Sequence, residues 1–187
     1  LTNAGVRLGM TGAVKAQVKK LDKKVADNIA AKSRIISGVA AVGRPITNAA
    51  VALKDCVGNV RTARTDANGY FSLSDSGLFY PVMLNVAAGG VPLHSIAYRE
   101  GTTNIHPFTE VVLSAYNRSA AGIDNMGLRF RANFKSLCPL PSEDRIDPLK
   151  KILVATLAPV LAQQAIDPST FDLFTSRFNA DRTGFDR

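Results

Sequence analysis

The stretch ARTDANGYFSL, residues 63–73, limits most tightly how this chain can fold, because it places a tight turn between two short β-prone runs. The runs cover residues 59–65 and 70–73. Asp66 can accept hydrogen bonds from its own backbone, and Asn68 and Gly69 tolerate the positive φ that hairpin loops require. The stretch therefore predicts a strand, a hairpin turn and a returning strand.

The residues on both sides of this turn repeat the pattern of short strands. Further strands are predicted at residues 35–42, 50–53, 79–86 and 91–98, with Gly, Pro, Asn and Asp between them. Short strands with turns every 8 to 12 residues indicate an antiparallel β-sandwich. We therefore expect a mainly β fold over residues 35–101.

The segment that precedes these strands, residues 1–34, is predicted to form a basic amphipathic helix. Apolar residues recur there at helical spacing on one narrow stripe, with lysines around it. We do not expect a helix with so narrow an apolar seam to be stable alone in water, so it should pack on its own domain or on a partner. The predicted interaction residues are Val14, Val18, Leu21 and Val25, rimmed by Lys15, Lys19 and Lys23.

The segment that follows the strands, residues 102–187, is predicted to form a cluster of helices. Pro107 should occupy the first position of a helix that ends near residue 117. A short helix is predicted at residues 128–137, and a longer one should begin with Asp147 as its N-cap and Pro148 after it. Pro159 should bend or shorten that helix. One last short helix is expected to be capped within residues 167–170.

The charge of the chain favours an acidic partner. The formal net charge is +8, and residues 11–34 hold seven basic side chains against two acidic ones. Such a segment attracts acidic protein faces, anionic lipids or nucleic acid. It contains no aromatic residue to stack on bases, so nucleic acid is not the partner that we expect. No run of 18 apolar residues occurs, and no membrane span is predicted.

Two consecutive stretches carry a family resemblance. They are ISGVAAVGRPITNAAVALKD and GNVRTARTDANGYFSL, which contain Gly38, a Gly43-x-Pro45 pair, Asn48-Ala49-x-Val51, Gly58 and the motif of residues 65–71. They resemble the carboxypeptidase regulatory-like domain, a transthyretin-like β-sandwich related to Cna-type surface modules. The resemblance covers residues 35–98, and the segments TTNIHPFTEVVLSA and FNADRTGFDR are similar to sequences that follow this domain in some bacterial exported proteins and lipoproteins. It implies a non-catalytic spacer, adhesive module or assembly unit outside the cytoplasm.

The sequence offers few candidates for chemistry. His94 and His106 have no Cys, Asp or Glu at metal-ligand spacing, and no catalytic or phosphate-binding motif occurs, so we expect neither an enzyme nor a cofactor or metal. Lys54 stands at a strand end beside a turn, where we expect it to be exposed. Residues 179–186 resemble half of a calcium loop, but a polar terminal turn is the expected outcome. Cys56 and Cys138 permit one disulfide, with two separate buried thiols as the alternative.

The function predicted from the sequence is that of a non-catalytic structural or interaction protein. We expect an extracytoplasmic location, at the cell surface, in the periplasm or secreted. There the protein would build a cell-surface assembly or filament, with itself or with a protein partner, or serve as an accessory subunit of an envelope complex. The alternative is a module that binds carbohydrate or another ligand through its loops, using Tyr80, Tyr98 and Tyr116.

Overall fold

The computed structural model describes residues 17, 19–20, 34–121 and 140–181. The chain divides into two compact units, Leu1–Ser33 and Arg34–Arg187. In the first unit, Gln17, Lys19 and Lys20 are helical and exposed. The other residues of the predicted interaction seam lie outside the described residues: Val14, Val18, Leu21, Val25, Lys15 and Lys23.

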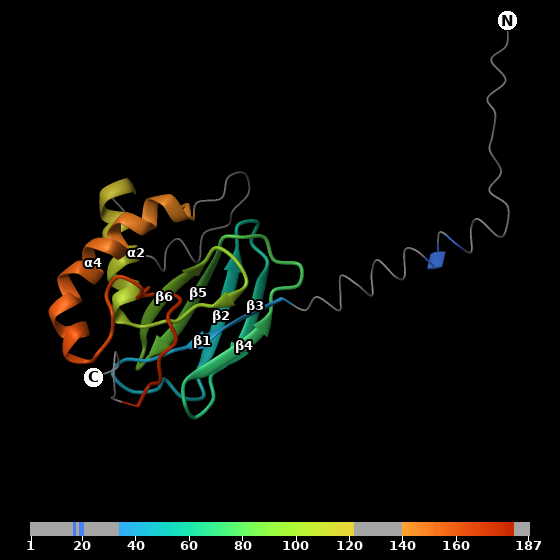
Figure 1. Ribbon diagram of the computed structural model, residues 1–187. Coiled ribbons are helices and arrows are strands. Elements are labelled where there is room, and N and C mark those ends of the chain that lie inside the picture. The colour runs from blue at the N-terminus through green and yellow to red at the C-terminus, as the bar shows by residue number, and fades with distance from the viewer. Residues whose placement is uncertain (1–16, 18, 21–33, 122–139, 182–187) are drawn as a thin grey trace, which may run out of the picture. The chain divides into compact units, whose positions relative to one another are not determined.

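The second unit is built on two β-sheets (Figure 1). One contains strands in the order β4 (Tyr70–Ser74), β1 (Ile35–Val39) and β7 (Gly101–Thr102). The other has the order β3 (Val60–Arg64), β2 (Ala50–Asp55), β5 (Val82–Ala88) and β6 (Val91–Ala97). Neighbouring strands are antiparallel except β1 and β7, which pair in parallel over two residues. The expectation of a β-rich fold with added helices is therefore confirmed.

The turn in the motif of residues 65–71 forms as predicted, but its two arms do not pair with each other. Asp66 Oδ1 accepts bonds from the backbone N–H groups of Asn68 and Tyr70, both at 2.8 Å, and Gly69 has φ +75°. β3 pairs with β2 and β4 pairs with β1, so the turn carries the chain from one sheet to the other. The predicted hairpin is wrong, because local turn chemistry reverses the chain without choosing the partner of each strand.

A wholly apolar cluster draws its side chains from both sheets. In β1, β2, β4 and β5, alternate residues point into this cluster. Gly38 lies in β1 between two members of the cluster, and an added Cβ would collide with the backbone carbonyl of Thr103. The buried members include Ile36, Val51, Leu53, Phe71, Val82, Leu84, Val86, Leu93 and Ile105.

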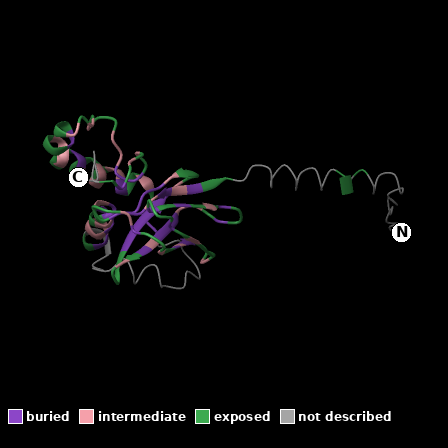
Figure 2. Ribbon diagram, turned by 90° about the horizontal axis from the view of Figure 1, so that it is seen from below, coloured by how far each residue is buried: buried purple, intermediate pink, exposed green. Residues whose placement is uncertain are grey.

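Helices α2 (Pro107–Ala121) and α4 (Glu143–Gln163) pack on the other face of the four-stranded sheet, whose strands β5 and β6 are mostly buried (Figure 2). The strand residue Met83 alternates with those of the first cluster and points towards the helices. A second apolar cluster forms there. Its buried members are Met83, Ile96, Val112, Leu113, Leu140, Ile146, Val154, Leu161, Leu173 and Phe174.

The start of α2 at Pro107 agrees with the prediction, whereas the start of α4 does not. α4 begins at Glu143 after Ser142, so Asp147 lies inside the helix and its Oδ1 contacts Lys150 Nζ at 2.7 Å. Two acidic residues in the first turn favour the earlier start, because they interact well with the positive end of the helix dipole. α4 also continues through Pro159 to Gln163.

The last predicted helix is a turn instead, and the other helical prediction lies outside the description. Asp167 Oδ1 accepts bonds from the backbone and the hydroxyl of Ser169, at 2.9 and 2.8 Å, which is an Asx turn that caps no helix. The helix predicted at residues 128–137 falls outside the described residues. Over the part of the chain that is described, neither helix has the length and apolarity needed to cross a bilayer.

Candidate functional site

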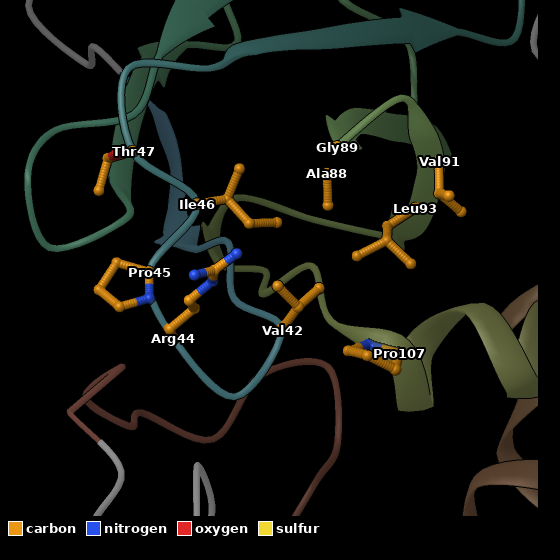
Figure 3. A pocket seen from close by; sticks show the side chains of 10 residues that line it. All are labelled: Val42, Arg44, Pro45, Ile46, Thr47, Ala88, Gly89, Val91, Leu93 and Pro107. Atoms are coloured by element: carbon orange, nitrogen blue, oxygen red, sulfur yellow. The ribbon is translucent and has the colours of Figure 1, made fainter.

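An open cleft of about 710 Å³ lies between the loop that follows β1 and the tip of the β5–β6 pair, beside the start of α2 (Figure 3). Most of its lining is aliphatic, and Arg44 brings the one formal charge among the ten lining residues. Figure 3 shows the Arg44 side chain along the wall, with its guanidinium between Val42 and Ile46. The lining residues are Val42, Arg44, Pro45, Ile46, Thr47, Ala88, Gly89, Val91, Leu93 and Pro107.

One wall of the cleft is supported by the turn in residues 65–71. The backbone N–H of Ala40 donates to Gly69 O at 2.8 Å, and that of Ile46 donates to Ala40 O at 2.9 Å. A Cβ at position 69 would lie 2.5 Å from Ala40 O and 3.3 Å from Pro45 Cα. Only glycine allows this approach, so the turn supports the loop that carries Arg44.

The opposite wall is the tip of the β5–β6 pair. Gly89 and Gly90 have φ values of +56° and +87°, as a two-residue hairpin turn requires, and Ala88 pairs with Val91. Val91 is 62% exposed, whereas Leu93 belongs to the apolar cluster between the sheets. The floor of the cleft is therefore continuous with the core.

Side chains of α2 cover the outer edge of β6, which is the last strand of the described sheet. The backbone N–H of His94 donates to Glu110 Oε2 at 2.7 Å, and Thr109 Oγ1 donates to His94 O at 2.7 Å. Pro92, two residues earlier, has no N–H. This edge is poorly suited to accept another strand.

The same carboxylate contacts the ring of His94, although no acidic residue stands at metal-ligand spacing from this histidine in the sequence. Glu110 Oε2 lies 2.8 Å from His94 Nδ1, and the Asn85 amide nitrogen lies 2.9 Å from His94 Nε2. Glu110 is 16 residues away in sequence, and the packing of α2 on β6 brings it close. The ring is 1% exposed, so the network joins a helix to a strand rather than presenting a group to solvent.

His106 occupies an equally buried position at the start of α2. Its Nε2 contacts Leu173 O at 2.7 Å, and its ring makes edge contacts with Phe108 and Phe178. Burial lowers the pKa of His106 to about 4, so the ring is neutral at pH 7 and Nε2 donates to the carbonyl. No group of three or more His, Cys, Asp or Glu that could hold a metal ion occurs among the described residues.

Lys54 is another residue that the structure places differently from the prediction. It is 8% exposed, because its register opposite Met83 directs it to the helix-covered face of the sheet. Cys56 is disulfide-bonded. Its predicted partner, Cys138, lies outside the described residues, as does most of the calcium-like segment 179–186.

A second cleft, of about 600 Å³, lies between α4 and residues 168–172 and is charged. Arg99 and Glu143 pair at 2.8 Å, and Lys150 Nζ contacts Asp147 and Asp172 at 2.7 and 2.8 Å. Burial alone would raise the pKa of Asp172, but the bond from Lys150 and two backbone N–H groups together lower it. Each acidic residue that lines this cleft is thus already neutralised by a cation of the same chain.

The tyrosines proposed for carbohydrate binding do not gather on one surface. Tyr80 packs against the cluster between the sheets and donates its hydroxyl to Asp75 Oδ2 at 2.6 Å. Tyr98 and Tyr116 pack against the cluster beneath the helices. Their rings contribute to two different cores, and they form no shared stacking platform.

Comparison with known proteins yields no match to a family model, to a curated protein or to a solved structure. The geometry of the molecule is therefore the basis for assigning a function.

Proposed function

We propose that this protein is a non-catalytic interaction module that binds a protein partner in the apolar cleft. The observation that carries the proposal is the cleft itself, which is large and open, and whose lining is aliphatic apart from Arg44 and Thr47. Pockets that bind partners or ligands are usually concave and mostly apolar, with a few polar groups that fix orientation. The lining residues supply contact surface and a charge, not a nucleophile with its base.

The wider proposal follows the sequence. The two sheets are proposed to form a transthyretin-like β-sandwich, and the protein to act outside the cytoplasm, in a cell-surface assembly or as an accessory subunit of an envelope complex. The sequence motifs at residues 38–71 support this identity, together with two sheets that share one apolar cluster. The helix predicted at residues 11–34 would provide a second contact in such an assembly.

Photocrosslinking from the cleft tests the proposal directly. A photoreactive residue at Val91, which is 62% exposed, should crosslink a partner that the same residue at Val57, which is 56% exposed and outside the cleft, does not reach. Val42→Asp should abolish the crosslink, because a charge on the cleft wall disfavours apolar contact. The crosslink counts as support only when the purified partner, or a second copy of this chain, reproduces it.

Molar mass by light scattering separates the two kinds of partner. A mass well above 19.9 kDa that persists in high salt and is lost in Val42→Asp indicates self-assembly through the cleft. Equal crosslinking from Val57 and Val91, or crosslinks unaffected by Val42→Asp, would show that the cleft is not the binding surface.

A further inference from the structure

We propose that the cleft recognises an apolar segment of a protein partner through an acidic side chain, Asp or Glu, which pairs with Arg44. This inference rests on the proposed function and specifies its ligand. It depends on the charge of the cleft, on the edge of β6 and on the contrast with the charged cleft beside α4.

The first observation is that Arg44 has no acidic partner among the described residues. Within the described part of the chain, no acidic side chain pairs with Arg44, and its guanidinium donates no hydrogen bond to another described residue. Other arginines of the β-sheet body do have acceptors: Arg34 contacts Asp75 and Glu100, Arg61 bonds to Val60 O and Ser76 O, Arg64 bonds to Asn48, and Arg99 bonds to Glu143.

The second observation concerns what surrounds this cation. The guanidinium lies on a wall made of Val42, Pro45 and Ile46. The side chains of these residues contain no hydrogen-bond acceptor. Arg44 is exposed, so a carboxylate forms a charge-assisted, bidentate pair with it that becomes stronger than the same pair in water once the partner covers the cleft. The surrounding aliphatic surface then favours apolar side chains next to that carboxylate.

The third observation restricts how the partner can bind. Many peptide-binding modules add the peptide as a strand to a sheet edge. Here Pro92 has no N–H to donate, and the outward N–H and C=O of His94 are bonded to Glu110 and Thr109. A partner at this end of β6 must therefore be recognised by its side chains, and the cleft offers apolar contact and one cation for that purpose.

The charged cleft beside α4 shows the opposite arrangement. Its acidic residues Glu143, Asp147 and Asp172 are paired with Arg99 and Lys150 of the same chain. A ligand that binds these acidic residues would have to break existing pairs, whereas a carboxylate at Arg44 would break none. The overall net charge of +8 also favours an acidic partner by attracting it over a distance.

Short peptides provide the test. The probes are N-acetylated, C-amidated pentapeptides of leucine and valine with one central glutamate, glutamine or lysine, and their binding is measured by fluorescence anisotropy on the full chain. The glutamate peptide should bind the wild type about tenfold more tightly than the glutamine peptide, and high salt should reduce the difference. In Arg44→Glu the preference should reverse, so that the lysine peptide binds best.

The matched control is Arg145→Glu, which changes the same charge at an exposed position that does not line the cleft. It should keep the preference for glutamate. Equal affinity for the glutamate and glutamine peptides, or a preference that survives Arg44→Glu, would overturn the inference. So would a glutamine peptide with a free C-terminal carboxylate that binds as well as the amidated glutamate peptide, because the terminus would then be the recognised group.

The two proposals can fail separately. If the crosslink from Val91 depends on the cleft but peptides show no charge preference, the interaction module stands and the acidic ligand is wrong. If no cleft-dependent crosslink forms, the proposed function itself is wrong.

Discussion

The two faces of the four-stranded sheet differ in the kind of contact that holds them. One face is covered by the other sheet through a cluster of aliphatic and aromatic side chains, with buried polar groups such as Asp75 and Thr65 beside it. The other is covered by α2 and α4 through a mixture of apolar contacts and buried polar groups, among them His94, His106 and Thr109. Adjacent side chains of β5 point to opposite faces, so the two kinds of contact meet at neighbouring residues: Leu84 points to the first face and Met83 to the second.

This difference suggests a division of labour in the fold. Apolar burial is strong but has no direction, so it holds two sheets together without specifying one position between them. Hydrogen bonds have direction. Glu110 accepts a bond from His94 N–H, and Thr109 and His106 donate to the carbonyls of His94 and Leu173, so these bonds fix where α2 lies. The polar groups on the helical face therefore determine position, while the apolar clusters supply most of the stability.

The largest expected effect comes from truncating the two adjacent residues of β5, which are both 0% exposed. Leu84→Ala should lower the free energy of unfolding by about 3 to 5 kcal/mol, because it leaves a cavity in a close-packed core. Met83→Ala should cost less, about 2 to 3 kcal/mol, because the unbranched, flexible methionine side chain packs less specifically than leucine. Urea unfolding of both variants measures the difference. A larger loss for Met83→Ala would invert the comparison.

Acid should weaken the helical face through His106. Its pKa of about 4 in the folded chain lies below the ordinary value of 6.5, so the unfolded chain binds the proton more readily. This contribution is fully present above about pH 6.5 and is lost as the pH falls to about 4, by up to roughly 3 kcal/mol. His106→Gln keeps a donor for Leu173 O but does not titrate. Its stability curve should be flatter in this window, and identical slopes for the two proteins would contradict the assignment.

Removing the Glu110 carboxylate should loosen the contact between α2 and β6. Glu110→Ala leaves the buried N–H of His94 and its ring without their acceptor, at a cost of about 1 to 3 kcal/mol. Glu110→Gln keeps one acceptor and should cost less. Hydrogen exchange gives a specific readout. In Glu110→Ala, exchange at the His94 amide should speed up more than exchange at the Leu84 amide. A uniform change at both amides would indicate a general loss of stability.

The smallest effect is expected in the charged cleft. Asp172→Asn removes a pair with Lys150 that is partly exposed, so we expect a loss of about 1 kcal/mol or less. Because the pKa of Asp172 is lowered in the fold, the difference between wild type and variant is present above about pH 4. It should disappear as the pH falls further and the carboxylate is protonated. A difference that persists in strong acid would assign the effect to packing.

The parts of this fold that were predictable from the sequence depend on neighbouring residues. The alternation of apolar residues predicts the strands, Asp66 and Gly69 predict the turn, and Pro107 predicts the start of α2. The pairing of β3 with β2, and of β4 with β1, was not predictable in this way. It depends on which strands can bury Val51 and Phe71 in the same core, and that is a property of the whole chain.

The candidate site shows the same limit. Gly43, Pro45 and the Gly89-Gly90 pair are residue types typical of loops, but nothing in their spacing indicates that the two loops form opposite walls of one cleft. The contact between His94 and Glu110 and the burial of Lys54 were missed for the same reason. Each depends on the face of a strand that a helix from a later segment covers.

The short distance in sequence between β6 and α2, which covers its edge, has a consequence for the synthesis of the protein on the ribosome. An uncovered strand edge can pair with a neighbouring chain, and a growing polypeptide exposes its edges before it is complete. Only 16 residues separate His94 from Glu110. At usual rates of translation the ribosome adds them in about one to three seconds. The residues of α2 that cover the edge of β6 are therefore synthesised within seconds of the strand itself, which shortens the time for which that edge can pair with another chain.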